Sequence, residues 1–426
     1  MKLKLKNIGK INSAEIEFNG ITVVAGDNNS GKSTIGKILY CIFKSFHNIE
    51  AEVHKERQTA VRRIFNLYRN YAKKPQEGVI TSIIPLVENI METDSSRSDL
   101  EKLIGEYYSS TPILKDDNQI FLDENVHPEL ISNIANRVQD VLLRENIEIE
   151  KLILRKNLRM ELGMNVGHVN DIRKSAEVEL CLRDGHIKFE VIGNETVEID
   201  ESVNLYKDIV YIDSPFVLDE LANGAYGKRQ MNYKGDLVKK LRFARNGNEF
   251  DVISELIVKE KIQKIIDEIN DICEGSLVNE EESFSYVASN LNRPLTIANL
   301  STGIKSFITL KTLLENGNIE ENGVVILDEP EIHLHPEWQL KFAEIIVLIQ
   351  KEFRVNFLIN THSPYFLNAI QAYALKHKIK NKCKYYITKS IDDLVDVADV
   401  TDEIEVIYEK MARPFQELKD LEFRYE

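Results

Sequence analysis

Apolar and polar residues alternate at the start of the chain in the pattern of a β-hairpin. The segment 2–18 reads KLKLKNIGKINSAEIEF, and the alternation runs along both sides of a turn that contains Gly9. A period of two places the apolar side chains on one face of a strand. The pattern returns at Glu177–Leu182 and His186–Ile192, on either side of Arg183–Asp184–Gly185, and predicts a second hairpin.

Short continuous apolar runs elsewhere in the chain predict the buried strands of a parallel sheet. These runs are Ile21–Ala25, Asp208–Ile212, Val324–Leu327 and Phe357–Ile359. Segments with helical apolar spacing are predicted at Ile35–Phe43, Gly78–Met91, Pro128–Leu162 and Val252–Ile272. The tail is predicted to add one more strand, Lys382–Ile387, and one or two amphipathic helices within Glu403–Leu421. Buried strands that alternate with helices are typical of α/β folds.

The first of these runs leads into the string GDNNSGKST, which has the form G-x-x-x-x-G-K-[ST] of a phosphate loop. Glycines let backbone N–H groups turn inward, and the N-terminus of the following helix attracts an anion. We expect Lys32 to reach the β- and γ-phosphates of ATP and Ser33 to bind Mg²⁺. The residues predicted to contact ATP here are Gly26, Asn28, Asn29, Ser30, Gly31, Lys32, Ser33 and Thr34.

Two adjacent acids, Asp328 and Glu329, follow the predicted strand Val324–Leu327. A carboxylate at this place can hold Mg²⁺ through water, and a second one can orient the water that attacks the γ-phosphate. We assign Asp328 to the metal and Glu329 to the water. Adjacent acids are common after strands, so this assignment depends on the phosphate loop that needs such a partner.

Two further short strings complete the set of candidate motifs. LSTGIK, at residues 300–305, leads into a predicted helix, Lys305–Leu314, and Ser301 is a residue type favoured at helix N-termini. His362 lies in THSP, directly after the run Phe357–Ile359. Taken alone, the first string indicates an ordinary helix cap and the second a histidine in a turn.

In this order and at these separations, the four strings resemble the motifs of ABC ATPases. The resemblance covers Met1–Phe43 and roughly Asp208–Ile387, and it implies a P-loop ABC-type ATPase head with an N-terminal antiparallel β-subdomain. It further implies that Ser301 and Gly303 bind the γ-phosphate of an ATP held by a second copy of the chain. His362, which follows the predicted strand Phe357–Ile359, would also contact a γ-phosphate. Two ATP molecules would then lie between the chains of a two-fold dimer, or of a higher oligomer built from it.

The string DEPEIHLHP differs from the sequence of transporter ATPases. It resembles the group that contains RecF, SMC-like proteins, OLD-family ATPases and the ATPases of bacterial anti-phage systems such as Septu. On this basis we predict three parts: 1–44 and 207–426 form the ATPase head, and 45–206 is a mainly helical insertion with a β-hairpin. The insertion shows no sustained heptads of a coiled-coil arm.

One departure concerns the glutamine that ABC ATPases carry after the strand predicted at Asp208–Ile212. This chain reads YIDSP there, so Asp213 or Ser214 is the candidate substitute. The printed sequence also shows no clustered acids of a Toprim nuclease, no H-N-H spacing and no Ser/His/Asp arrangement. We therefore expect any second chemistry to lie on a separate chain.

The composition of the chain bears on its partners and its cellular compartment, and it does not change the predicted fold. The net charge is −15, whereas dedicated nucleic-acid binders are usually basic. Locally basic stretches at 54–74, 228–245 and 376–384 leave nucleic-acid binding open. No apolar run approaches the length of a membrane span. The four cysteines show no pairing or metal spacing, which favours a reduced, cytoplasmic protein.

Three functions compete at this stage. The favoured hypothesis is a slowly hydrolysing ATPase that acts as sensor or regulator in an anti-phage complex, with an effector, for example a nuclease, encoded nearby. A RecF-like ATPase that clamps DNA during repair is the alternative. A transporter subunit is disfavoured by DEPEIHLHP and by the long insertion.

Overall fold

The computed structural model describes residues 1–68, 83–93, 96–110, 126–163, 166–171, 173–193, 196–222, 232–245, 252–280 and 283–425. These residues form two compact units. The first, called here the head unit, comprises Met1–His47 and Leu154–Glu426, and the second, the helical unit, comprises Asn48–Ile153. The segment predicted as an insertion, 45–206, is longer than the helical unit, because the strands that follow residue 175 join the main sheet of the head unit.

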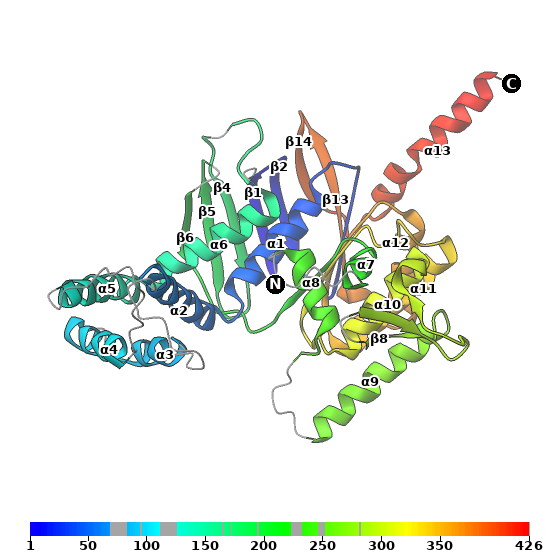
Figure 1. The fold of residues 1–426 in the computed structure, drawn as a ribbon. Helices are drawn as coiled ribbons and strands as arrows, with labels where there is room; N and C mark the ends of the chain where they lie inside the picture. Colours follow the sequence, from blue (N-terminus) through cyan, green and yellow to red (C-terminus); the bar gives the residue numbers. More distant parts are fainter. Residues whose placement is uncertain are drawn as a thin grey trace. The chain divides into compact units, whose positions relative to one another are not determined.

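The head unit is built on an eleven-stranded mixed sheet in its described residues, with the order β6-β5-β4-β1-β2-β14-β13-β3-β12-β11-β7 (Figure 1). The strands are β1 (Lys2–Ile8), β2 (Ile11–Glu17), β3 (Ile21–Ala25), β4 (Ala176–Cys181), β5 (His186–Ile192), β6 (Thr196–Glu201), β7 (Ile209–Ile212), β11 (Val324–Asp328), β12 (Asn356–Thr361), β13 (Cys383–Ile391) and β14 (Leu394–Asp399). A smaller sheet has the order β10-β9-β8, with β8 (Ser276–Glu280), β9 (Ser283–Val287) and β10 (Leu295–Thr296).

The two ends of the large sheet differ in direction and in burial. Strands β13, β3, β12, β11 and β7 run parallel, and every residue of β3 and β11 is buried. Strands β6, β5, β4, β1 and β2 are antiparallel neighbours, and buried residues alternate with more exposed ones along β4. Continuous apolar strands covered on both faces suit a parallel sheet, and alternating strands suit an antiparallel one. Both predicted hairpins are confirmed.

Helices cover the parallel end of the sheet on both faces. On one face, Val23, Val325 and Phe357 belong to a core that also includes Phe307 and Phe342. On the other face α1 contacts β7, β11 and β12. The helices of the head unit are α1 (Lys32–Phe46), α7 (Val217–Ala222), α8 (Tyr233–Arg242), α9 (Val252–Asn270), α10 (Thr302–Glu315), α11 (Pro336–Phe353), α12 (Pro364–Lys376) and α13 (Glu405–Tyr425).

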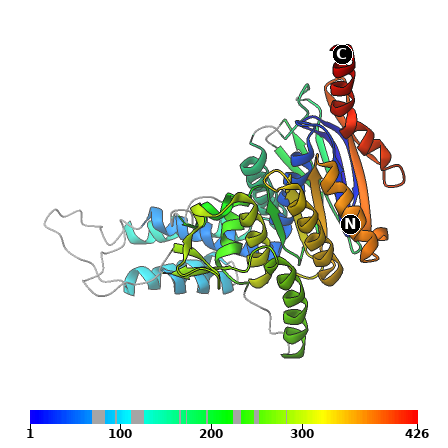
Figure 2. The ribbon, with the colours of Figure 1, turned by 90° about the vertical axis from the view of Figure 1, so that its right-hand side faces the viewer.

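Close packing against α1 depends on Gly36. A side chain there would meet Ile326 of β11 and Tyr211 of β7 at 3.1 Å. Because successive residues of a strand face opposite sides, Ile326 packs toward α1 while Val325 and Leu327 join the core on the other face. The head unit thus has the α/β fold of a P-loop ABC-type ATPase head with an antiparallel β-subdomain. Figure 2 shows the sheet from a second direction.

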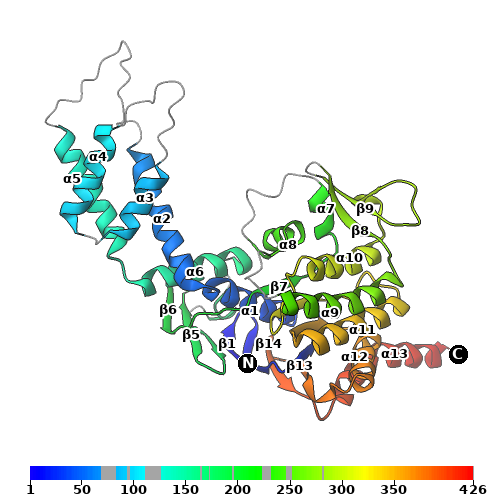
Figure 3. The ribbon, with the colours of Figure 1, turned by 90° about the horizontal axis from the view of Figure 1, so that it is seen from below.

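The helical unit has a core of its own. It contains α2 (Ile49–Leu67), α3 (Ile84–Glu92), α4 (Arg97–Ser110) and α5 (Val126–Leu142), together with the start of α6 (Asn146–Leu162). Apolar residues such as Phe65, Ile104 and Val138 fill the space between these helices, which Figure 3 shows side by side. The segment 78–91 was predicted as one helix, and its residues 78–82 lie outside the described part. The segment 128–162 was predicted as one helix but forms two, α5 and α6.

The end of the head unit adds elements that the apolar pattern only partly predicts. The strand expected at 382–387 is β13, and the helical tail expected within 403–421 is the single helix α13. Strand β14, between them, was not predicted. In the described residues, no helix is long and apolar enough to cross a membrane.

Candidate active site

The phosphate loop connects β3 to α1, as the sequence predicts. Gly26 has a φ of +153° and Gly31, the residue that caps α1, a φ of +82°. These values lie in the region that glycine adopts far more easily than other residues. A Cβ atom on Gly26 would also lie only 1.8 Å from Thr388 Oγ1. The loop therefore needs glycine at its first position both for its backbone and for its space.

Lys32 is held inside the loop that it follows. Its side chain is 5% exposed, and its Nζ donates to the carbonyl oxygens of Gly26 and Asp27, at 2.9 Å each. The Glu329 carboxylate lies 3.5 Å from the same Nζ. A buried ammonium group requires such partners. These contacts hold the lysine in a place where the phosphates of a nucleotide could replace the carbonyls as acceptors.

A cleft of about 880 Å³ opens over the phosphate loop. Asn28 to Thr34 and Glu329 line it on one side, and two segments of the β-subdomain, Gly9–Lys10 and Gly167–Asn170, line it on the other. The N–H of Gly9 donates to the carbonyl oxygens of Val166 and Gly167, which joins these two segments. Asp328, His362, Ser301 and Gly303 are not among the described residues that line it. The sequence alone does not show that these two segments line the cleft together, since more than 150 residues separate them.

Asp328, at the end of β11, has a hydrogen bond to each carboxylate oxygen. Tyr211 Oη donates to Oδ2 and Asn360 Nδ2 donates to Oδ1, at 2.9 Å each. Burial and the neighbouring Asp328 carboxylate raise the pKa of Tyr211 well above its usual value, so the hydroxyl stays protonated and can donate. These two partners fix the orientation of the carboxylate. Neither was predicted, although both lie on strands that flank β11.

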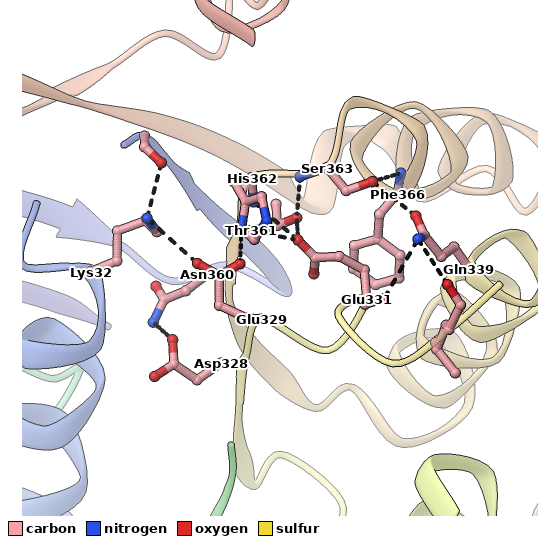
Figure 4. A network of polar contacts seen from close by, with 12 residues as sticks. Lys32, Asp328, Glu329, Glu331, Gln339, Asn360, Thr361, His362, Ser363 and Phe366 are labelled. Atoms are coloured by element: carbon pink, nitrogen blue, oxygen red, sulfur yellow. Dashed lines mark hydrogen bonds and ion pairs between the residues drawn. The ribbon is translucent and has the colours of Figure 1, made fainter. Parts of the chain in front are cut away.

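Glu329 reaches the site through an unusual backbone conformation. Its φ is +54°, a left-handed value that costs a non-glycine residue on the order of 1–3 kcal/mol. Its N–H donates to the carbonyl of Asn360 at 2.9 Å, which holds the turn. The carboxylate then contacts both Lys32 Nζ and His362 Nδ1. Figure 4 shows Glu329 between these two residues.

Glu331 connects the turn after β11 to the end of β12. It is 3% exposed, and its Oε1 accepts from Thr361 Oγ1 at 2.5 Å and from the His362 N–H at 3.0 Å (Figure 4). Burial raises the pKa of Glu331. With Glu329 and His362 it forms a group of side chains close enough to bind one metal ion. From the sequence, Glu331 is the first alternative for the catalytic carboxylate if Glu329 does not have that role.

The LSTGIK string begins a helix, but three residues earlier than expected, since α10 starts at Thr302. Ser301 is its N-cap, and its Oγ accepts from the Ile304 N–H at 3.4 Å. A Cβ on Gly303 would meet the Trp338 ring at 2.6 Å, so glycine is needed there for packing. Lys305 is buried and pairs with Asp219 at 2.6 Å. Within one chain these contacts explain the motif without a ligand.

The two candidates for the missing glutamine have partners inside the head unit. Asp213 Oδ2 accepts from Tyr233 Oη at 2.5 Å, and Ser214 Oγ accepts from the Phe216 N–H at 3.2 Å. Tyr233 in turn packs on Tyr211, with ring centroids 4.6 Å apart. Asp213 thus belongs to a cluster of polar and aromatic side chains next to Asp328. The structure does not bring it into the cleft over the phosphate loop.

More than half of the chain matches a known protein family. Residues 79–368 match the family described as "AAA domain, putative AbiEii toxin, Type IV TA system". The chain belongs to this family. The matched residues include Ser301, Asp328, Glu329 and His362, whereas the phosphate loop precedes them.

Proteins similar to this AAA-domain protein include retron ATPases and a Septu protein. It is 24% identical over 418 residues to the "Retron Vc95 probable ATPase" of Vibrio cholerae serotype O1 biovar El Tor, covering 88% of this chain and 73% of the relative. It is 29% identical over 169 residues to the "Retron Ec83 probable ATPase" of Escherichia coli, covering 35% and 30%. It is 26% identical over 185 residues to the "Septu protein PtuA" of Bacillus thuringiensis, covering 39% and 43%.

Solved structures similar to this AAA-domain protein include two SMC heads. The SMC head domain from Thermotoga maritima is 12% identical with a TM-score of 0.40, covering 94% of this chain and 98% of that one. An SMC head bound to the C-winged helix domain of ScpA is 12% identical with a TM-score of 0.45, covering 93% and 97%. The fold assignment made above depends on the sheet order and the phosphate loop of this chain itself.

Proposed function

We propose that this AAA-domain protein binds ATP with Mg²⁺ and hydrolyses ATP to ADP and phosphate. The observation that carries the proposal is the meeting of Lys32, Glu329 and His362, which come from three distant parts of the sequence. The Glu329 carboxylate contacts the Lys32 Nζ on one side and the His362 Nδ1 on the other. Such a carboxylate, beside a phosphate-binding lysine, is suited to orienting a water molecule for attack on a γ-phosphate.

The residues present fit a nucleotide and its metal ion. The backbone at Gly26 and Gly31 leaves no room for side chains and opens the loop toward the cleft. Lys32 and the loop residues Asn28 to Thr34 would hold the phosphates, while Ser33 and Asp328 would hold Mg²⁺. When bound, Mg²⁺ neutralises charge on the β- and γ-phosphates. Because Tyr211 and Asn360 already occupy one lone pair on each Asp328 oxygen, contact through a water molecule suits this site.

In the proposed reaction Glu329 accepts a proton from the attacking water. The Glu329 carboxylate lies 3.5 Å from Lys32 Nζ, which places this proton acceptor beside the group proposed to bind the phosphates. His362 is proposed to contact the γ-phosphate while Glu331 holds its backbone N–H. We infer slow turnover, because a regulatory ATPase needs a long-lived ATP-bound state.

We propose further that two chains share each site, with Ser301 and Gly303 of one chain completing the phosphate loop of the other. Neither residue lines the cleft of its own chain among the described residues. Two large apolar side chains next to catalytic residues are exposed, Ile332 at 56% and Tyr365 at 61%. A two-fold interface would cover such side chains.

The biological role proposed is that of a cytoplasmic sensor or regulator in anti-phage defence, working with a separately encoded effector. The names of the relatives, retron ATPases and Septu PtuA, support it. None of these names favours the RecF-like alternative in DNA repair. Co-purification of the full chain with the product of a neighbouring gene tests this role. Recovery of the chain alone from cells that express both genes would contradict it.

Complementation between two inactive variants tests the shared site. Ser301→Arg should keep ATP binding but block hydrolysis, and Lys32→Ala should prevent ATP binding in its own loop. A heterodimer of the two has one intact site, formed by the phosphate loop of the first variant and the signature of the second. By simple counting of intact sites, we expect each heterodimer to recover up to about half of wild-type ATPase activity, and an equal mixture, in which about half of the dimers are heterodimers, up to about a quarter. Heterodimers that form without recovering activity would contradict the shared site.

A further inference from the structure

The C-terminal helix α13 is joined to the phosphate loop by one lysine. Lys410 lies in the second turn of α13. Its Nζ lies 2.8 Å from Asp27 Oδ2, on the loop, and donates to the carbonyl oxygen of Thr388, on β13, at 2.9 Å. Lys410 is 22% exposed and Asp27 is 66% exposed. Nearly 400 residues separate the two partners in sequence, so this contact is a product of the fold.

Lysines contact both the side chain and the backbone of Asp27. Its carboxylate pairs with Lys410, and its backbone carbonyl accepts from Lys32 Nζ at 2.9 Å. Lys410 therefore acts on the residue whose carbonyl also positions the phosphate-binding lysine. A single charged group on α13 is thereby connected through one residue to the ATP-binding ammonium.

Strand β13 supports the same part of the loop. It pairs with β3 up to Ile387 and Ala25, directly before Thr388 and Gly26. Thr388 is fully buried, and its Oγ1 occupies the space that a Cβ on Gly26 would need. With its carbonyl bonded to Lys410, Thr388 links the loop, the strand and the helix in one packed contact.

Only the beginning of α13 is packed in this way. Ile407 is 1% exposed, and Tyr408 Oη donates to Gln371 at 2.7 Å. From Arg413 onward the described side chains are exposed, and Figure 1 shows this part of α13 extending away from the sheet. Lys410 thus lies where the packed part of α13 ends.

We propose that Lys410 is a positioning residue for the phosphate loop, so that ATP affinity depends on the seating of α13 against β13. This inference rests on the proposed ATP binding and adds a regulatory contact to it. Loss of the Lys410–Asp27 pair frees the Asp27 end of the loop and raises the entropy cost of ordering the loop around phosphates. The chemical step uses Glu329 and His362, whereas the partners of Lys410 in the described part of the chain are Asp27 and Thr388, so the rate of that step is unaffected.

The test is a titration of the full chain with a fluorescent ATP analogue, together with steady-state ATPase kinetics. Lys410→Met keeps most of the side-chain length but removes the charge. We expect it to raise the Kd for the analogue and the KM for ATP about fivefold, the upper range for one partly exposed ion pair. The kcat should stay within about twofold of wild type. Lys410→Arg should restore affinity, because it restores the charge.

Two further variants make the outcome decisive. Asp27→Asn, at an exposed position that should fold normally, is expected to weaken binding as Lys410→Met does, and the double variant should be no weaker than either single one. Lys419→Met, on the exposed part of the same helix, is the matched control and should bind as wild type does. Unchanged affinity in Lys410→Met, or equal loss in Lys419→Met, overturns the inference alone. Wild-type protein that binds no analogue overturns the proposed function, and the inference with it.

Discussion

The two sides of the candidate site are built in different ways. On the phosphate-loop side, nine consecutive residues from Gly26 to Thr34 form the whole cradle. On the carboxylate side, Asp328 and Glu329 are oriented by Tyr211, Asn360 and His362, which lie on β7 and on or directly after β12, the two strands that flank β11. The first side depends on local backbone geometry and the second on the order of strands in the sheet. We therefore expect changes on the first side to abolish binding and changes on the second to impair hydrolysis.

The largest expected effect is that of Lys32→Ala. It removes the one ammonium held between the Gly26 and Asp27 carbonyls. We expect the Kd for ATP to rise at least about 100-fold, because a charge-assisted contact to phosphate is lost in a nearly buried position. Isothermal titration with ATP and Mg²⁺ measures it. Unaltered affinity would place the nucleotide elsewhere on the chain.

A smaller effect is expected from Glu331→Gln on the carboxylate side. Thr361 and His362 both donate to Oε1, which the amide oxygen can replace, but the amide is neutral and puts an N–H₂ group at the buried position of Oε2, where no acceptor lies within hydrogen-bond distance among the described residues. His362 should be less well positioned, which lowers kcat about tenfold while ATP affinity is kept. Steady-state kinetics beside direct titration separate the two. A rise in the Kd for ATP with kcat unchanged would contradict the division into a phosphate-loop side that determines binding and a carboxylate side that determines hydrolysis.

Tyr211→Phe removes one of the two hydrogen bonds to Asp328 and leaves the ring packed. The freed Oδ2 loses its fixed direction. We expect the Mg²⁺ concentration for half-maximal activity to rise about tenfold, the lower end of the loss found when groups that orient metal ligands are removed. ATP binding without metal should be unaffected. Identical Mg²⁺ dependence would mean that Asp328 needs no such support.

The smallest effect on activity is expected from Glu161→Gln, a control from outside both sides of the site. Burial raises the pKa of Glu161 to about 7, and its Oε1 accepts from the Tyr233 N–H at 2.7 Å. In the unfolded chain this acid titrates near 4.5, so the folded state binds more protons between about pH 4.5 and 7. Its contribution to stability is therefore present below about pH 4.5 and is lost as the pH rises to about 7.

By linkage this loss amounts to at most about 3 kcal/mol. Glu161→Gln should unfold at a higher temperature than wild type at pH 8 and show a flatter dependence on pH, with unchanged kcat. Thermal unfolding across pH 5–8 measures it. A fall in kcat as large as that of Glu331→Gln would mean that the effect of Glu331 is not specific to the carboxylate side of the site.

The same contrast explains what the sequence could predict. The phosphate loop is one string, so the motif and its flanking pattern locate every residue in it. Asp328 and Glu329 were predictable because an apolar strand precedes them. Tyr211 and Asn360 carry no local signal, and their role depends on β7 and β12 lying on either side of β11. Lys410, and the segment Gly167–Asn170 over the cleft, depend in the same way on pairings between distant parts of the chain.

The predicted insertion, 45–206, does not coincide with the helical unit, Asn48–Ile153, for a related reason. Helical patterns follow residue 44 in the sequence, but β4 to β6 pair onward from β1 and belong to the head unit. Their alternating pattern predicts strands without specifying a partner. Partner strands are selected by the complete sheet, which no single segment encodes.

The nucleotide bound by Glu329→Gln tests the central claim most directly. The variant keeps the size of the side chain and removes the carboxylate that contacts Lys32 and His362. After incubation with ATP and Mg²⁺ and removal of free nucleotide, the account predicts that the variant retains ATP, while wild type retains ADP or none. Bound ADP in the variant, formed as fast as by wild type, would contradict the assignment of hydrolysis to the carboxylate side.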